Sequence, residues 1–200
     1  LIRSFKGVDA DRTAVTGISW GGYMTCIVAS VDHRFKAAVP VYGCGFLYDG
    51  ESVQRPAIDA LSPEQRTEWI SKYDPSAWLP ECRVPILFVN GTNDIHYPLV
   101  SYSRSYGLVK SQKQVRIKVK MRHSHQAGWE PNEIGRFIDH YLLGEKSLPQ
   151  LGNPASNDGM ASVEVMTEVG LESAQFHYTT GTNRLAERNW SSIPATIKGV

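Results

Sequence analysis

Residues 17–21 read Gly-Ile-Ser-Trp-Gly and lie between two segments of different character. Residues 13–16 form a short run typical of a β-strand, and residues 23–31 are mostly apolar and compatible with a helix. The stretch therefore predicts a strand, a sharp turn and a helix. In the pattern G-x-S-x-G, small residues on both sides let the strained serine backbone turn, which lifts the hydroxyl above the sheet edge. Ser19 is thus the candidate nucleophile.

Strands and helices alternate along the chain after this turn. We predict strands at 36–42, 86–90 and 115–121, with Pro40 marking the end of the first because proline cannot donate to a sheet ladder. Apolar residues at helical spacing predict a last helix from about 131 to 142. Such alternation implies an α/β fold with a parallel sheet flanked by helices.

A further helix start is visible between the first two of these strands. Ser62 is a helix cap, Pro63 takes the first helical position, and Gln65 closes a capping box. The polar and aromatic stretch around this helix, residues 46–80, is a candidate pocket wall.

The chain changes character after Pro149. Residues 151–159 are rich in Gly, Pro, Asn and Ser, and the segments that follow alternate at period two. We therefore divide the chain into residues 1–149, the C-terminal part of a catalytic α/β domain, and residues 150–200. The second part is interpreted as a linker and the start of a small antiparallel, β-sandwich-like domain.

Composition excludes several classes of partner. With 21 basic and 20 acidic residues the net charge is +1, which gives no reason to expect nucleic acid or a charged membrane surface. No apolar stretch approaches the roughly 20 residues that span a bilayer. The three cysteines have no zinc spacing, so we predict no metal and no cofactor.

A serine needs a base, and the base needs a carboxylate that orients it. On parallel α/β sheets these groups follow the serine in the order Asp or Glu, then His. Asp94 lies three residues past Gly91, at the end of a buried strand, and is the candidate acid. His123 and His125 both follow the next strand. We predict His125 as the base because it leaves the longer loop for reaching Ser19, with His123 as the alternative. The histidine that is not the base lines the pocket or lies on the surface.

Four further residues flank these segments. The backbone N–H of Trp20 begins the helix after Ser19 and is the candidate oxyanion donor. His96, Tyr97 and Trp129 are candidate substrate-binding residues because they lie next to the predicted acid and base.

Two longer stretches resemble the prolyl-oligopeptidase-like branch of the α/β-hydrolases. They are Gly-Ile-Ser-Trp-Gly-Gly-Tyr-Met-Thr at 17–25, followed by Asp-His-Arg-Phe-Lys-Ala-Ala-Val at 32–39, and Val-Pro-Ile-Leu-Phe-Val-Asn-Gly-Thr-Asn-Asp at 84–94. The branch includes dipeptidyl aminopeptidases, acylaminoacyl peptidases and acetyl xylan esterase-like enzymes. The resemblance implies first strands, and a second oxyanion donor, that would lie before Leu1. It also implies an exposed sheet edge that could self-associate.

Three functions remain open at this point. We predict a serine hydrolase that cleaves a carboxylic ester, such as a carbohydrate O-acetyl group. A serine peptidase of the prolyl oligopeptidase or acylaminoacyl peptidase type is the alternative, because both use one triad. A non-catalytic binding protein on the same fold is the third. The expected partners are a small-molecule ester, an acetylated carbohydrate or a short peptide. The tail from 176 to 190 resembles that of secreted hydrolases, which favours a secreted or periplasmic location.

Overall fold

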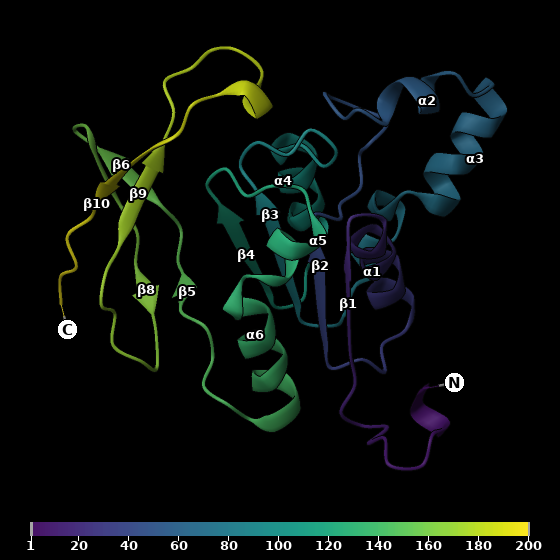
Figure 1. Ribbon diagram of the computed structural model, residues 1–200, viewed down its shortest axis with the longest axis horizontal. Coiled ribbons are helices and arrows are strands. Elements are labelled where there is room, and N and C mark those ends of the chain that lie inside the picture. Colours follow the sequence, from purple (N-terminus) through teal and green to yellow (C-terminus); the bar gives the residue numbers. More distant parts are fainter. Residues whose placement is uncertain (1, 200) are drawn as a thin grey trace.

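The computed structural model describes residues 2–199, and a four-stranded parallel sheet forms its centre (Figure 1). The strands are β1 (Ala14–Ile18), β2 (Ala37–Val41), β3 (Ile86–Gly91) and β4 (Lys113–Lys118). They lie side by side in the order β1-β2-β3-β4, and all three pairings are parallel. The parallel α/β sheet expected from the sequence is therefore confirmed.

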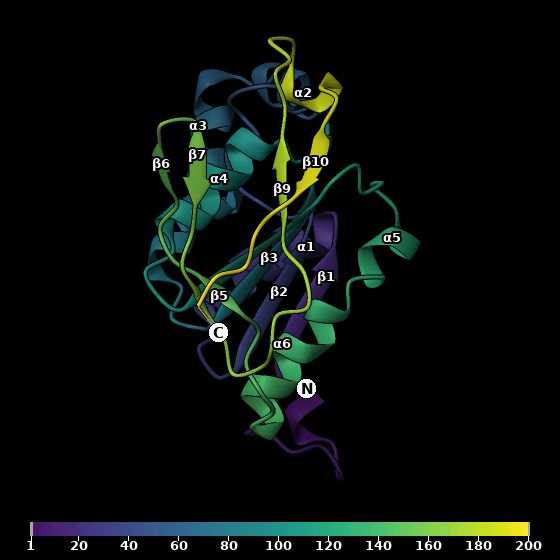
Figure 2. The same cartoon turned by 90° about the vertical axis from the view of Figure 1, so that its left-hand side faces the viewer.

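Within residues 2–199 six α-helices alternate with or follow the strands. They are α1 (Trp20–Val31), α2 (Arg55–Asp59), α3 (Pro63–Tyr73), α4 (Leu99–Leu108), α5 (His125–Trp129) and α6 (Asn132–Leu143). Short 3₁₀ turns occur at η1 (Ile2–Ser4), η2 (Pro75–Ala77), η3 (Leu79–Glu81) and η4 (Leu185–Glu187). α1 packs on β1 and β2, and α4 and α6 lie on opposite faces of the sheet (Figure 2). Within residues 2–199, none of the helices has the length and apolar character that crossing a membrane requires.

Helix ends follow the local signals of the sequence. Ser62 accepts a hydrogen bond from the N–H of Gln65, and the Gln65 side chain accepts one from the N–H of Ser62, so the predicted capping box is confirmed. At the other end of the domain, Gly144 closes α6 in the left-handed conformation at φ 74°. A residue without a Cβ adopts this conformation without steric cost.

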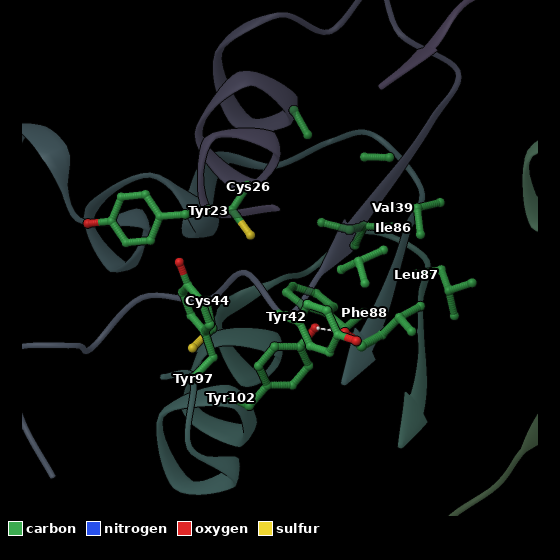
Figure 3. Packing of buried hydrophobic residues seen from close by; sticks show 14 of the residues in the cluster. Tyr23, Cys26, Val39, Tyr42, Cys44, Ile86, Leu87, Phe88, Tyr97 and Tyr102 are labelled. Carbon is green, nitrogen blue, oxygen red and sulfur yellow. Dashed lines mark hydrogen bonds between the residues drawn. The ribbon is translucent and has the colours of Figure 1, made fainter. Parts of the chain in front are cut away.

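The core lies between the sheet and its helices (Figure 3). Every residue of β2 and β3 is buried, because helices cover both faces of these two central strands. The fully buried aromatic side chains of this core include Tyr42, Phe88, Tyr97 and Tyr102. Two of the four, Tyr42 and Tyr97, belong to the loops at the carboxyl ends of the strands, so the core extends directly to the site described below.

Pro40 lies inside a central strand, which corrects the prediction that it marks a strand's end. It pairs with Gly17 of β1. On the β3 side, Ala38 N–H donates to the Pro85 carbonyl and Tyr42 N–H to the Val89 carbonyl. The ladder thus continues on both sides of the proline, and one missing donor interrupts the β2–β3 pairing without ending the strand.

The last strand of the sheet ends earlier than predicted. Alternation in the sequence continues to Met121, but β4 ends at Lys118, level with Gly91 of β3. Residues 119–121 turn away instead, with Lys120 in the left-handed region at φ 54°. This turn adds three residues of loop before His123.

Between residues 150 and 199 the chain forms three small antiparallel sheets, as the fold prediction anticipated. β5 (Gln150–Leu151) pairs with β8 (Val165–Met166), β6 (Ala155–Asn157) with β7 (Met160–Ser162), and β9 (Gln175–Tyr178) with β10 (Ser191–Pro194). Nearly all of their residues are exposed. The division into two domains at 149/150 stays a prediction.

Candidate active site

Ser19 occupies the turn between β1 and α1 in a strained conformation. Its φ of 59° and ψ of −118° lie where non-glycine residues are rare, at a cost of about 1–3 kcal/mol. The backbone is fixed by two hydrogen bonds: Ser19 N–H donates to the Val41 carbonyl at 2.9 Å, and Tyr23 N–H donates to the Ser19 carbonyl at 2.9 Å. The turn is therefore anchored both to the neighbouring strand and to its own helix.

Close backbone packing around this turn depends on three glycines. A Cβ on Gly17 would lie 2.5 Å from the carbonyl carbon of Gly21, and one on Gly22 would lie 2.3 Å from the Val41 oxygen. A Cβ on Gly43 would lie 1.9 Å from the Gly22 carbonyl carbon. By contrast, a Cβ on Gly21 meets nothing within 4 Å. The steric need that we assigned to both glycines of the motif therefore holds for Gly17, whereas on the helix side it falls on Gly22.

Replacing Gly43 should destabilise this packing. Because the new methyl group would overlap the backbone of α1, we expect Gly43→Ala to lower the free energy of unfolding by about 1–3 kcal/mol. Gly107→Ala is the control, since a Cβ there meets nothing within 4 Å and alanine favours the helix by up to about 1 kcal/mol. Denaturant unfolding measures both changes. Equal stability of the Gly43 variant and the parent would contradict the close approach.

Asp94 follows β3 and is held by the backbone of its own turn. Its side chain is almost wholly buried. Oδ1 accepts hydrogen bonds from His96 N–H at 2.7 Å and from Tyr97 N–H at 3.0 Å. Oδ2 is left to accept from Nδ1–H of His123 at 2.8 Å. A carboxylate anchored in this way fixes both the orientation and the tautomer of the imidazole.

His123, not His125, lies between Ser19 and Asp94, which corrects the predicted position of the base. Nε2 of His123 is 2.9 Å from Ser19 Oγ and accepts a hydrogen bond from the Ser19 hydroxyl. His125 is exposed at the first position of α5. The reason is the early end of β4, since the turn at 119–121 supplies the loop length that we had required of residues 122–125. We refer to Ser19, His123 and Asp94 as the candidate triad.

Aromatic rings enclose the imidazole of His123. The Tyr42 ring stacks on it with centroids 4.4 Å apart, His96 lies at 4.6 Å, and Tyr97 lies nearly parallel to it at 5.8 Å. The Tyr42 hydroxyl also donates to the Arg122 carbonyl at 2.6 Å. Tyr42 thus restrains both the ring and the loop of the histidine.

Removing the Tyr42 hydroxyl should loosen this loop. We expect Tyr42→Phe to lower turnover by about three- to tenfold, because a net hydrogen bond of about 0.5–1.5 kcal/mol to the Arg122 carbonyl is lost while the stacked ring remains. The matched control is Tyr141→Phe, which removes a hydroxyl bonded to Gln112 on the outside of the molecule. Steady-state kinetics on the same ester measure both. An equal effect of the two variants would show that the Tyr42 hydrogen bond does not position the base.

Tyr42 was not predicted from the sequence. Tyr42 follows β2 at φ 64°, a conformation that no sequence pattern announces for a tyrosine. Of the three predicted substrate-binding residues with aromatic rings, two contact the candidate triad and one does not. His96 and Tyr97 do touch His123. Trp129 is exposed at the end of α5, and within residues 2–199 no hydrogen bond or ring contact joins it to the candidate triad.

Tyr97 has a buried hydroxyl beside the nucleophile. The residue is fully buried, and among the described residues its hydroxyl has no hydrogen-bond partner at ordinary distance and angle, although the Ser19 hydroxyl lies close by. Burial raises the pKa of Tyr97 well above its usual range, and the neighbouring Ser19 hydroxyl only partly offsets that rise. The phenol is therefore protonated at neutral pH, and its ring fills space next to Ser19.

The backbone N–H and the indole ring of Trp20 have different positions relative to the site. As the first residue of α1, its N–H has no acceptor within the helix and carries the positive end of the helix dipole. The indole is about half exposed and meets Tyr23 edge to face at 5.0 Å. The backbone position fits an oxyanion donor, and the ring borders the surface around Ser19.

Hollows occur on other parts of the surface of residues 2–199. One, of about 550 Å³, follows α3 and is lined by Pro63, Glu64, Thr67, Glu68 and Lys72. Another, of about 380 Å³, lies around Cys82 and Lys110. Neither hollow is lined by a residue of the candidate triad. The candidate site is therefore identified by the hydrogen bonds among Ser19, His123 and Asp94, not by the size of a hollow.

A strained serine after a parallel strand, a histidine and a buried aspartate on later loops define a serine-hydrolase type of site on an α/β-hydrolase fold. Residues 1–142 match the prolyl oligopeptidase family, and the chain belongs to that family.

Solved structures with the same fold include both peptidases and esterases. An acylaminoacyl peptidase in complex with Z-Gly-Gly-Phe-chloromethyl ketone is 25% identical at a TM-score of 0.52, over 59% of this chain and 21% of that one. An acetyl xylan esterase from Paenibacillus sp. R4 is 25% identical at a TM-score of 0.56, over 70% of this chain and 48% of the esterase. The uncomplexed acylaminoacyl peptidase of Pyrococcus horikoshii shares the fold at 23% identity and a TM-score of 0.56, over 67% of this chain and 25% of that one. The chain thus spans less than half the length of each.

Proposed function

We propose that this protein hydrolyses a carboxylic ester with a short acyl group through an acyl-enzyme on Ser19. The observation that carries the proposal is the continuous pair of hydrogen bonds from Ser19 Oγ to His123 Nε2 and from His123 Nδ1 to Asp94 Oδ2, at 2.9 and 2.8 Å. A serine hydroxyl becomes a nucleophile when a histidine so oriented accepts its proton.

The proposed reaction has two halves. Ser19 Oγ attacks the carbonyl carbon, its proton moves to His123 Nε2, and the Trp20 N–H stabilises the oxyanion. His123 then gives the proton to the leaving alcohol, and the C–O bond to that alcohol breaks. In the second half a water loses a proton to His123 and attacks the acyl carbon. Ser19 regains the proton as the carboxylic acid leaves.

Tyr97 favours a short acyl group. Its ring and hydroxyl fill space beside Ser19 and are fully buried, so a bulky acyl chain on this side would have to displace a packed aromatic residue. An acetyl group makes no such demand. The likeness to an acetyl xylan esterase supports the same substrate class, a carbohydrate O-acetyl ester.

A peptidase acting on short peptides is the second candidate, favoured by the match to the prolyl oligopeptidase family over residues 1–142. Peptide hydrolysis would use the same proposed groups, with His123 protonating a leaving amine.

The test compares acetylated xylan, acetyl and longer-chain aryl esters, and aminoacyl anilides as substrates of one preparation. We expect kcat/KM to be highest for acetyl esters and to fall as the acyl chain lengthens. Faster cleavage of the anilides than of every ester would replace the ester proposal by the peptidase. Absence of cleavage together with absence of fluorophosphonate labelling would leave a non-catalytic binding protein.

A further inference from the structure

The C-terminal segment touches the loop that carries the candidate acid. The side-chain amide of Asn93, the residue before Asp94, donates to the carbonyls of Ala186 at 2.8 Å and Arg188 at 2.9 Å. In Figures 1 and 2 the η4 turn, drawn in yellow, lies at the end of the molecule toward which β3 runs. The antiparallel part of the chain is thus bonded to the site.

Two further hydrogen bonds connect the Asn93 side chain with the loop that carries the candidate base. Asn93 Oδ1 accepts from the Thr92 hydroxyl at 2.6 Å, and Thr92 Oγ1 in turn accepts from Lys120 N–H at 2.9 Å. Lys120 lies in the left-handed turn that leads from β4 to His123. Two side chains therefore connect residues 186 and 188 with the acid loop and with the base loop.

The side-chain donors of Asn93 and Thr92 all have acceptors in this path. Both amide protons of Asn93 have carbonyl acceptors, and Thr92 donates through its hydroxyl while accepting a backbone N–H. Thr92 is buried, so its bonds are protected from water. Such a path restrains the positions of two loops against each other, and these loops hold the 2.8 Å contact between Asp94 and His123.

We propose that Asn93 is a positioning residue, which uses the backbone carbonyls of Ala186 and Arg188 as a brace to hold the acid and base loops at a fixed distance from each other. The inference rests on the proposed function, because the aligned groups are those of the candidate triad. It gives the segment after residue 149 a part in turnover that is separate from substrate recognition. Misplacement of a reacting group by about 1 Å can cost a hundredfold in rate.

The test uses three substitutions in the otherwise unchanged protein: Asn93→Ala, Thr92→Val and Thr92→Ser. We expect Asn93→Ala and Thr92→Val each to lower kcat by about ten- to a hundredfold, with KM for a small acetyl ester nearly unchanged. Thr92→Ser keeps the hydroxyl and should retain most of the parent's turnover. The rate of fluorophosphonate labelling of Ser19, which needs no substrate binding, should fall in parallel with kcat.

Arg184→Gln is the matched control. Arg184 directly precedes the η4 turn and forms an exposed 3.5 Å ion pair with Glu51 of a different loop. The substitution breaks this pair but leaves the hydrogen bonds of Asn93 intact, so kcat should be unchanged. The double variant Thr92→Val with Asn93→Ala should lose little more than either single one, because residues of one path are not additive. Thermal unfolding verifies that each variant is folded, and if Asn93→Ala fails to fold, the near-isosteric Thr92→Val carries the test.

Two outcomes are kept apart by this design. If the parent labels with the probe and folded Asn93→Ala or Thr92→Val labels at the same rate, the brace is overturned while the proposed function stands. If the parent itself neither labels nor hydrolyses an ester, the proposed function fails. A purely additive loss in the double variant would show that the two residues act separately and would also overturn the path.

Discussion

Ser19→Ala should lower turnover on an acetyl ester by roughly a millionfold while leaving the fold intact. The substitution removes the one oxygen that attacks the substrate and that bonds to His123 at 2.9 Å. The backbone bonds of the turn, to Val41 and from Tyr23, do not involve that oxygen. Alanine adopts the strained φ of 59° no less readily than serine, so the free energy of unfolding should change little. Initial rates and denaturant unfolding measure the two quantities.

Ser30→Ala is the control for this experiment. Ser30 lies on the same helix α1, and its hydroxyl donates to the carbonyl of Cys26, away from the turn. Its loss should leave turnover unchanged. Residual activity of Ser19→Ala within about tenfold of the parent would remove Ser19 from the proposed mechanism, whatever the behaviour of the control. Loss of a catalytic nucleophile lowers turnover by far more than tenfold.

The local parts of this site could be predicted because each has a local physical cause. The Gly-x-Ser-x-Gly turn is recognisable because Gly17 lacks a side chain where the backbones approach: a Cβ there would lie 2.5 Å from the carbonyl carbon of Gly21. The apolar run before Gly91 predicts a strand buried on both faces, and β3 is buried throughout. A carboxylate three residues later must then emerge at the sheet's edge, where Asp94 lies.

What sequence could not supply is the point at which pairing between distant strands stops. Alternation from 115 to 121 shows which side chains share a face, but β4 pairs only as far as Gly91 of β3 extends. The left-handed turn at Lys120 is likewise set by the hydrogen bond of its N–H to Thr92, a residue of another loop. Pro40 was misjudged for a related reason: only the neighbours Ala38 and Tyr42 reveal that the ladder continues past it. The brace at Asn93 depends on residues more than ninety positions away.

The choice between the two histidines is where this missing information has the largest expected effect. Because His123 bonds to both Ser19 and Asp94, His123→Ala should lower kcat about as far as Ser19→Ala does, roughly a millionfold, since members of a triad act as one unit. His125 is exposed at the start of α5, and surface substitutions of this kind change stability by only about 0.5 kcal/mol. His125→Ala should therefore keep nearly the parent's kcat and pH profile.

Kinetics of both variants over a pH series, with fluorophosphonate labelling beside them, distinguish the two assignments. Ser19 in His123→Ala should label far more slowly at every pH, because no other imidazole of residues 2–199 is within hydrogen-bonding distance of its hydroxyl. The double variant His123→Ala with Ser19→Ala should be no slower than either single one. A large loss in His125→Ala combined with a normal profile in His123→Ala would return the base to His125. That result would require residues 122–125 to rearrange before catalysis, breaking the Tyr42 hydroxyl bond to the Arg122 carbonyl that now holds His123 over Ser19.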